Sequence, residues 1–128
     1  MSGARPQLLS EHFKLREFHC RDGTPVPGHK IGELRELCQR YLEPLRAHFG
    51  RVDILSGYRT EAHNARVAGA PASMHLYRLS VPGVAADVKC ATGSARDWYR
   101  YLDAAGPGGL GLYTGFVHVD TRRGRARW

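Results

Sequence analysis

The segment GLGLYTGFVHVDT, residues 109–121, contains two short runs with the composition of β-strands. Between them the two runs contain the β-branched, aromatic and other apolar residues that strands favour. The side chains of a strand alternate between its two faces, so Val117 and Val119 share one face and are predicted to enter the core. His118 and Asp120 share the opposite face. The segment therefore predicts a sheet that buries one face and carries polar groups on the other.

Two further runs have the character of strands. The run GVAADVKC occupies residues 83–90, and a shorter run occupies residues 52–55. On the first of these, alternation places Asp87 on the face opposite to three apolar residues. Those residues are Val84, Ala86 and Val88. This predicted strand, like the one that carries His118, has a polar group on one face only.

Apolar residues recur at helical spacing over residues 31–49. They are Ile31, Leu34, Leu37, Cys38, Leu42, Leu45 and Phe49. Pro44 falls inside this run, and because proline lacks a backbone donor, we expect it to kink the helix or to split it in two. Thr60 and Ser94 are typical capping residues. They predict a short helix after Thr60 and a longer one over residues 94–105.

The order of the main predicted elements is helix, strand, strand, helix, strand and strand. This order is typical of an α+β domain in which an antiparallel sheet has helices packed on one face. The 128 residues fit one such domain, to which we assign residues 1–128. We expect residues 1–12 to form a loosely ordered N-terminal segment. No run approaches the roughly 20 apolar residues of a membrane helix, so no membrane span is predicted.

The formal charge of +7 raises the question of a nucleic-acid partner. The basic residues are scattered along the chain, however, and only residues 122–127 (RRGRAR) are densely basic. We therefore predict no nucleic-acid partner and keep a basic nucleic-acid-binding domain as an alternative. The same charge would attract any other anionic polymer.

The cysteines and the first residues leave the cellular compartment open. Cys20, Cys38 and Cys90 are odd in number and lack the spacing of a zinc knuckle. Residues 1–13, MSGARPQLLSEHF, lack the apolar core of about 7–15 residues that a secretory signal contains. Either the protein is not exported by that route, or its leader is not part of this sequence.

Two of the seven histidines stand out as candidate metal ligands. His75 and His118 each flank a strand-like run that carries a carboxylate, and Asp87 is the carboxylate of the first run. A catalytic zinc site commonly takes three protein ligands from His and Asp or Glu and leaves a fourth position for water. These three residues fit that requirement by type. From the residues alone, they compete with the plainer hypothesis that each is an ordinary hydrogen-bonded polar group.

Five short motifs occur along the chain in a particular order. They are Ser56-Gly57-Tyr58-Arg59-Thr60, Ser73-Met74-His75, Gly83-Val84-Ala85-Ala86-Asp87, Gly109-Leu110-Gly111-Leu112-Tyr113 and Phe116-Val117-His118-Val119-Asp120. An arginine-rich stretch and Trp128 follow. This order closely resembles the LAS-type zinc peptidases, which include D-Ala-D-Ala carboxypeptidases and murein endopeptidases and share their fold with hedgehog signalling domains. The resemblance covers Phe13 to Trp128 and is closest to the bacterial and phage branch with a C-terminal His-Val-Asp strand.

The resemblance implies a hedgehog-like fold and one Zn²⁺ ion held by His75, Asp87 and His118. It also implies a peptidase that cuts D-amino-acid-containing peptide stems or cross-links of peptidoglycan, in the cell envelope or delivered by a phage. We expect the protein to act as a monomer. The alternative is a zinc-stabilised binding or virion structural module of the same fold, without turnover.

The resemblance leaves the general base open. Many relatives carry a Glu, Asp or His two or three residues before the last zinc ligand, but Phe116 and Gly115 occupy those positions here. Asp120 is a candidate base, because it shares a strand face with His118. Its other possible role is to hold a ligand imidazole or an arginine in place. The residues favour neither role over the other.

Other residues are candidates for the substrate site. Arg59 matches an arginine that relatives place near the cleaved bond, where it would stabilise developing charge or bind a carboxylate. The alternative for Arg59 is a structural ion pair. Ser73 and Tyr113 are predicted to contribute hydrogen bonds, and His63, four residues after Arg59, is a weaker candidate for the cleft wall. Trp128 is predicted to close the edge of the core.

The spacing between the first two ligands departs from the family pattern. Eleven residues separate His75 from Asp87, whereas relatives have six. The extra five residues are assigned to residues 78–82, because the flanking segments each match on their own. An insertion at a loop tip costs little closure entropy, so we expect an external loop beside the substrate cleft.

Overall fold

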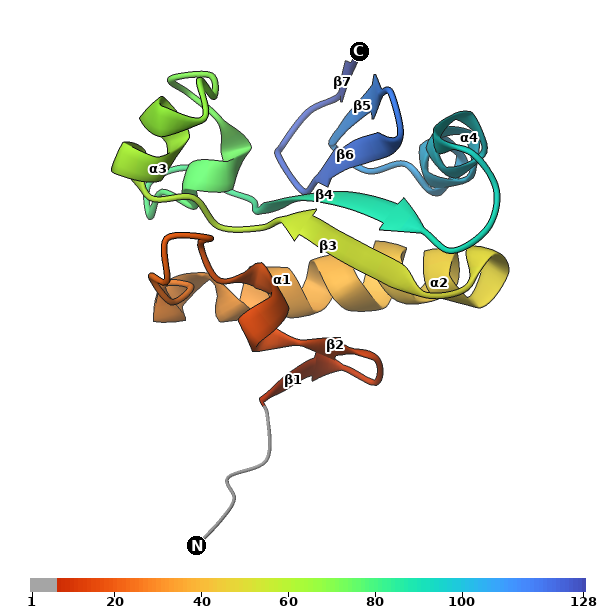
Figure 1. The fold of residues 1–128 in the computed structure, drawn as a ribbon, viewed down its shortest axis with the longest axis horizontal. Coiled ribbons are helices and arrows are strands. Elements are labelled where there is room, and N and C mark those ends of the chain that lie inside the picture. The colour runs from red at the N-terminus through yellow and green to blue at the C-terminus, as the bar shows by residue number, and fades with distance from the viewer. Residues whose placement is uncertain (1–6) are drawn as a thin grey trace, which may run out of the picture.

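The computed structural model describes residues 7–128, which form an α+β domain around one five-stranded sheet (Figure 1). The strand order is β3-β4-β6-β5-β7, and neighbours are antiparallel except for the parallel pair β5 and β7. The strands are β3 (Val52–Ser56), β4 (Ala85–Cys90), β5 (Gly109–Tyr113), β6 (Phe116–Asp120) and β7 (Ala126–Arg127); a separate pair joins β1 (Leu8–Ser10) to β2 (Phe13–Lys14). The helices are α1 (Ile31–Leu37), α2 (Glu43–Phe49), α3 (Glu61–Arg66) and α4 (Ala95–Ala105), with 3₁₀ turns at Leu15–Phe18, Gly28–Lys30 and Met74–Leu76. The predicted α+β class is confirmed.

The core lies between one face of the sheet and the helices α1, α2 and α4. Its fully buried members include Leu34, Leu45, Val88, Leu102, Val117 and Val119. Burying each such side chain contributes about 1.5–3 kcal/mol relative to leaving it exposed. Figure 1 shows α3 on the other side of β3 and β4 from α1 and α2. The helices therefore cover one face of the sheet, as predicted, and α3 alone lies apart from them.

The helix predicted over residues 31–49 runs from α1 into α2 through a widened π-helical turn, Cys38–Leu42. Pro44 follows directly after this turn, in the first turn of α2. Proline has no N–H to donate, and its ring occupies space next to the preceding turn of backbone. The π-helical turn accommodates both defects, so the structure shows an irregular but continuous helix. It ends at Gly50, whose φ of 81° suits glycine.

The two predicted helix caps are confirmed. The Thr60 hydroxyl accepts a hydrogen bond from the His63 N–H at the start of α3. Ser94 caps α4 by accepting from the Asp97 N–H, and the Asp97 carboxylate accepts from the Ser94 N–H in return. Such reciprocal caps satisfy donors that the first helical turn leaves free. Both helices thus begin where the sequence indicates.

The N-terminal segment differs from the prediction of loose order over residues 1–12. From Leu8 onward the chain forms β1, and the Leu9 side chain is buried in the core. The Glu43 carboxylate accepts hydrogen bonds from the Ser10 hydroxyl and the His12 N–H, so α2 also holds this segment. The run is too short to show a period in the sequence, and the remainder of the prediction, residues 1–6, lies outside the described residues. No helix within residues 7–128 has the length and apolar character needed to cross a membrane.

Candidate metal centre

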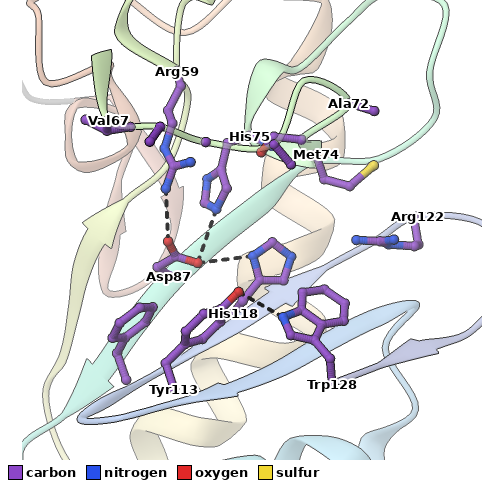
Figure 2. Close-up of a pocket in the computed structure, with 15 residues that line it drawn as sticks. Arg59, Val67, Ala72, Met74, His75, Asp87, Tyr113, His118, Arg122 and Trp128 are labelled. Carbon is purple, nitrogen blue, oxygen red and sulfur yellow. Dashed lines mark hydrogen bonds and ion pairs between the residues drawn. The ribbon is translucent and has the colours of Figure 1, made fainter. Parts of the chain in front are cut away.

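Three polar side chains, His75, Asp87 and His118, converge on the sheet face opposite the helices (Figure 2). Asp87 on β4 is the register partner of His118 on β6, so the two side chains leave the sheet on the same side. His75 reaches them from the 3₁₀ turn Met74–Leu76. Its Nε2 atom lies 3.1 Å from Asp87 Oδ1, and His118 Nδ1 lies 3.1 Å from the same oxygen. All three side chains are buried.

The long spacing between His75 and Asp87 does not separate them. The Ser73 hydroxyl accepts from the His75 N–H, and the Tyr77 hydroxyl donates to the Ala85 carbonyl at 2.6 Å. These two hydrogen bonds fix both ends of the segment that connects His75 to Asp87. Residues 78–82 project outward between them as an exposed loop, in which Leu79 is 77% exposed. The structure therefore places the five extra residues where the sequence predicted, in an external loop.

The second nitrogen of each imidazole fixes its tautomer. His75 Nδ1 lies 2.7 Å from the Gly57 carbonyl oxygen, which can only accept, so Nδ1 carries the hydrogen. His118 Nε2 lies 2.6 Å from the Asp120 carboxylate and likewise carries a hydrogen. In the neutral rings, His75 Nε2 and His118 Nδ1 therefore carry no hydrogen, and each offers a lone pair. Both lone pairs face the Asp87 carboxylate.

This donor set fits a zinc ion. Lone pairs that face a carboxylate repel it unless a cation or a proton lies between them. Ligands held about 2.0–2.1 Å from a tetrahedral Zn²⁺ are separated from one another by about 3.3 Å. The two 3.1 Å contacts of Asp87 are close to that value, and all three ligand atoms lie within 4.8 Å of one another. A carbonyl and a carboxylate behind the ligand imidazoles are also typical of zinc centres.

Electrostatics keeps this cluster in the form that binds a cation. Burial alone would raise the pKa of Asp87, but its interactions with the His118 and His75 imidazoles outweigh it and hold the pKa well below its usual range. Burial would lower the pKa of His118, but its hydrogen bonds to Asp120 and Asp87 outweigh that effect and raise it. Asp87 therefore stays ionised, and a cation can replace the proton that His118 shares.

Asp120 lies behind His118 and not in the cavity. Its side chain is fully buried, and it does not line the space in front of the three ligands. Its carboxylate accepts from His118 Nε2 and from the Nε and Nη2 atoms of Arg122, all at 3.0 Å or less. Of the two predicted roles for Asp120, this geometry favours holding His118 and Arg122 in place over accepting a proton from substrate water.

Arg59 lies beside the metal centre as predicted, but it is held by internal partners. Its Nε donates to the Ser56 hydroxyl, Nη1 donates to Asn64 Oδ1, and Nη2 donates to Asp87 Oδ2 at 3.3 Å. Only 16% of its side chain is exposed. Arg59 thus forms the ion pair that the sequence left as its alternative role; it orients the carboxylate ligand and also lines the cavity.

The three ligands open into a cavity of about 460 Å³. Ser73 and Tyr113 line it, as predicted. His63 is not among the lining residues, so its placement in the cleft wall is wrong. A four-residue spacing brings side chains together only within a helix, whereas Arg59 precedes the Thr60 cap of α3.

The cavity also contains residues that the sequence did not indicate, chiefly Trp128 and Arg122. Trp128 does not close the core edge, because 45% of it is exposed and its ring centre lies 5.0 Å from that of His118. Its indole N–H donates to the Tyr113 hydroxyl at 2.8 Å. The parallel pairing of β7 with β5 carries it there, and a two-residue strand leaves no periodic signal.

The Gly-Leu-Gly motif of β5 makes room for these groups. Leu110 points into the core, whereas Gly109 and Gly111 lie on the face that carries the site. A Cβ atom on Gly111 would collide with the Trp128 indole, and one on Gly109 would collide with the Asp120 carboxylate. The motif is therefore required by the close approach of β5 to the groups around His118.

Two histidines and an aspartate that face an open cavity form a donor set typical of catalytic zinc sites, which take three protein ligands and leave a fourth position open. The family model described as Peptidase M15 matches residues 11–120. The chain therefore belongs to the peptidase M15 family, whose members are zinc-dependent LAS-type peptidases, and the resemblance found in the sequence is confirmed. No curated protein and no solved structure matches the chain.

Proposed function

We propose that this zinc peptidase hydrolyses amide bonds in the D-amino-acid-containing peptide stems or cross-links of peptidoglycan, with one Zn²⁺ held by His75, Asp87 and His118. The observation that carries the proposal is the convergence of two imidazole lone pairs and an ionised carboxylate at the floor of an open cavity. This arrangement leaves one side of a bound ion free for water and substrate.

The charge around the cavity supports an anionic peptide as substrate. Arg59 and Arg122 line the cavity, and their charges balance those of Asp87 and Asp120. A divalent cation would leave the centre with a formal charge of about +2. Peptidoglycan stems carry several carboxylates close to their amide bonds, and the net charge of +7 would attract the polymer over a longer range.

The chain's own residues would perform distinct tasks in hydrolysis. When bound, zinc lowers the pKa of water and polarises a peptide carbonyl. Gly57 and Asp120 hold His75 and His118 in the tautomers that offer a lone pair. Arg59 fixes Asp87 and lines the cavity, where its positive charge would support charge on the carbonyl oxygen.

A second candidate function is recognition without turnover. One observation favours it: of the residues from 7 to 128 that line the cavity, Asp87 alone has a carboxylate in its side chain. Phe116, which lines the cavity two residues before His118, has no group that can accept a proton. A zinc-stabilised module of this fold would still bind peptidoglycan peptides in the cavity.

Digestion of purified muropeptides, followed by mass spectrometry, tests the proposal. We expect a mass change of one water for each cut amide with the zinc-loaded protein and none after chelation. The His118→Ala variant should be inactive, whereas His29→Ala, at an exposed histidine away from the cavity, should match the parent. Muropeptides that bind but remain intact would support the second candidate, and muropeptides that neither bind nor change would refute both.

A further inference from the structure

Arg122 enters the cavity from the chain segment that follows β6. Figure 2 shows its guanidinium on the opposite side of the three ligands from Arg59. Two contacts hold it there. The Asp120 carboxylate binds the edge formed by Nε and Nη2, and the guanidinium carbon lies 5.3 Å from the centre of the Trp128 ring. The side chain is therefore fixed in position before any ligand arrives.

This arrangement uses only one edge of the guanidinium. Within residues 7–128, Nη1 of Arg122 has no hydrogen-bond partner, and 31% of the side chain is exposed. A guanidinium carries five N–H donors, and its end edge can hold a carboxylate through two parallel bonds. Arg59 differs in this respect, because its Nε, Nη1 and Nη2 atoms all have partners within the protein.

Arg122 lines the same cavity as the three metal ligands. The Trp128 ring lies 5.0 Å from the His118 ring and 5.3 Å from the Arg122 guanidinium, so these two contacts connect the centre to the arginine. An extended peptide advances about 3.3–3.6 Å per residue. The His118 ring and the Arg122 guanidinium are thus at most about 10 Å apart, which is the length of about three extended residues.

We propose that Arg122 is the substrate-binding residue that selects peptides with a free carboxylate near the cleaved bond. The inference rests on the proposed function and deepens it by naming the chemical group recognised. Asp120 and Trp128 hold the guanidinium in place, and Nη1 with the outer side of Nη2 receives the carboxylate. Arg59 remains with the Asp87 ligand.

Paired substrates that differ only in the carboxylate test this role. The probes are N-acetyl-L-Lys-D-Ala-D-Ala as the free acid and as its C-terminal amide. The zinc-loaded parent should favour the acid in kcat/KM by about tenfold or more, which corresponds to a charge-assisted hydrogen bond. Arg122→Gln should abolish this preference, mainly through a higher KM for the acid, and Arg122→Lys should restore part of it. Arg123→Gln, at an exposed neighbour outside the cavity, should behave as the parent.

The ratio of acid to amide separates recognition from positioning. In Arg122→Gln, Asp120 keeps its bonds to His118 and to the backbone N–H of residue 122. If Arg122 only held Asp120, both substrates would lose rate equally and the preference for the acid would remain. That result would overturn the inference, and so would a parent that cleaves both peptides at the same rate.

A binding readout makes the test independent of turnover. The chain has two tryptophans, and the indole N–H of Trp98 donates to the Thr92 carbonyl outside the cavity. In NMR titrations with the acid, the indole signal of Trp128 should shift while that of Trp98 stays fixed, and the amide or the Arg122→Gln variant should remove the shift. A shift without cleavage would uphold the inference and refute the proposed activity. Equal shifts with acid and amide would refute the inference.

Discussion

Replacing Asp120 by Asn tests whether this residue positions His118 or accepts a proton. The carboxylate receives donors on both of its oxygens, from His118 on one and from Arg122 on both. An amide keeps one oxygen and turns an N–H group toward one of these donors. At least one charge-assisted bond is then lost, which costs about 1.5–3 kcal/mol.

The loss should appear in zinc affinity more than in catalysis. Removing the group behind a ligand imidazole typically weakens metal binding by about 10- to 100-fold, or roughly 1.4–2.8 kcal/mol, in agreement with the loss of one such bond. Chelator competition measures this affinity. At saturating zinc, kcat on muropeptides should fall by less than about tenfold, whereas removal of a general base costs about 10²–10⁴. Parental zinc affinity together with a hundredfold loss of kcat would refute the positioning role.

Two further predictions concern the inserted loop and acid. Deleting residues 78–82 should leave zinc bound and lower the free energy of unfolding by about 1.5–3 kcal/mol, because the buried ammonium of Lys30 loses its hydrogen bond to the Val81 carbonyl. Metal analysis and thermal unfolding measure the two effects. Loss of zinc would show that the loop helps to build the site. Although burial alone would raise the pKa of Asp120, hydrogen bonds from His118 and other donors hold it well below its usual range. A lowered pKa in the folded protein stabilises the fold at pH values above the unfolded pKa of about 3.9. The metal-free protein should therefore lose stability below about pH 4, and the Asp120→Asn variant should lose less. Identical dependence of the two unfolding free energies on pH would contradict this.

Local periodicity explains why much of the sheet could be predicted. Alternation in β4 and β6 separates Val117 and Val119 from the face that carries Asp87 and His118, and the register pairs these last two residues directly. His75 was found through its motif, although its distance from Asp87 along the chain is unusual. The sequence therefore identified the three side chains that the structure brings together.

Tertiary contacts determine the features that the sequence did not reveal. Leu9 is held in place because its side chain packs in the core, and β7 forms because it pairs with β5. The position of Asp120 behind His118 depends on Arg122, which faces it from beyond the end of β6. Strand alternation places Asp120 and His118 on the same face, but it does not show which of them reaches the cavity.

Zinc content measured by mass spectrometry on purified protein tests the metal centre most directly. The parent should bind about one zinc per chain, because three protein ligands complete a single catalytic site. His75→Ala and His118→Ala should each lose most of the metal and keep their helical circular dichroism, and His29→Ala should bind as the parent does. Full zinc occupancy in both ligand variants, or a parent that binds no zinc at neutral pH, would contradict the account.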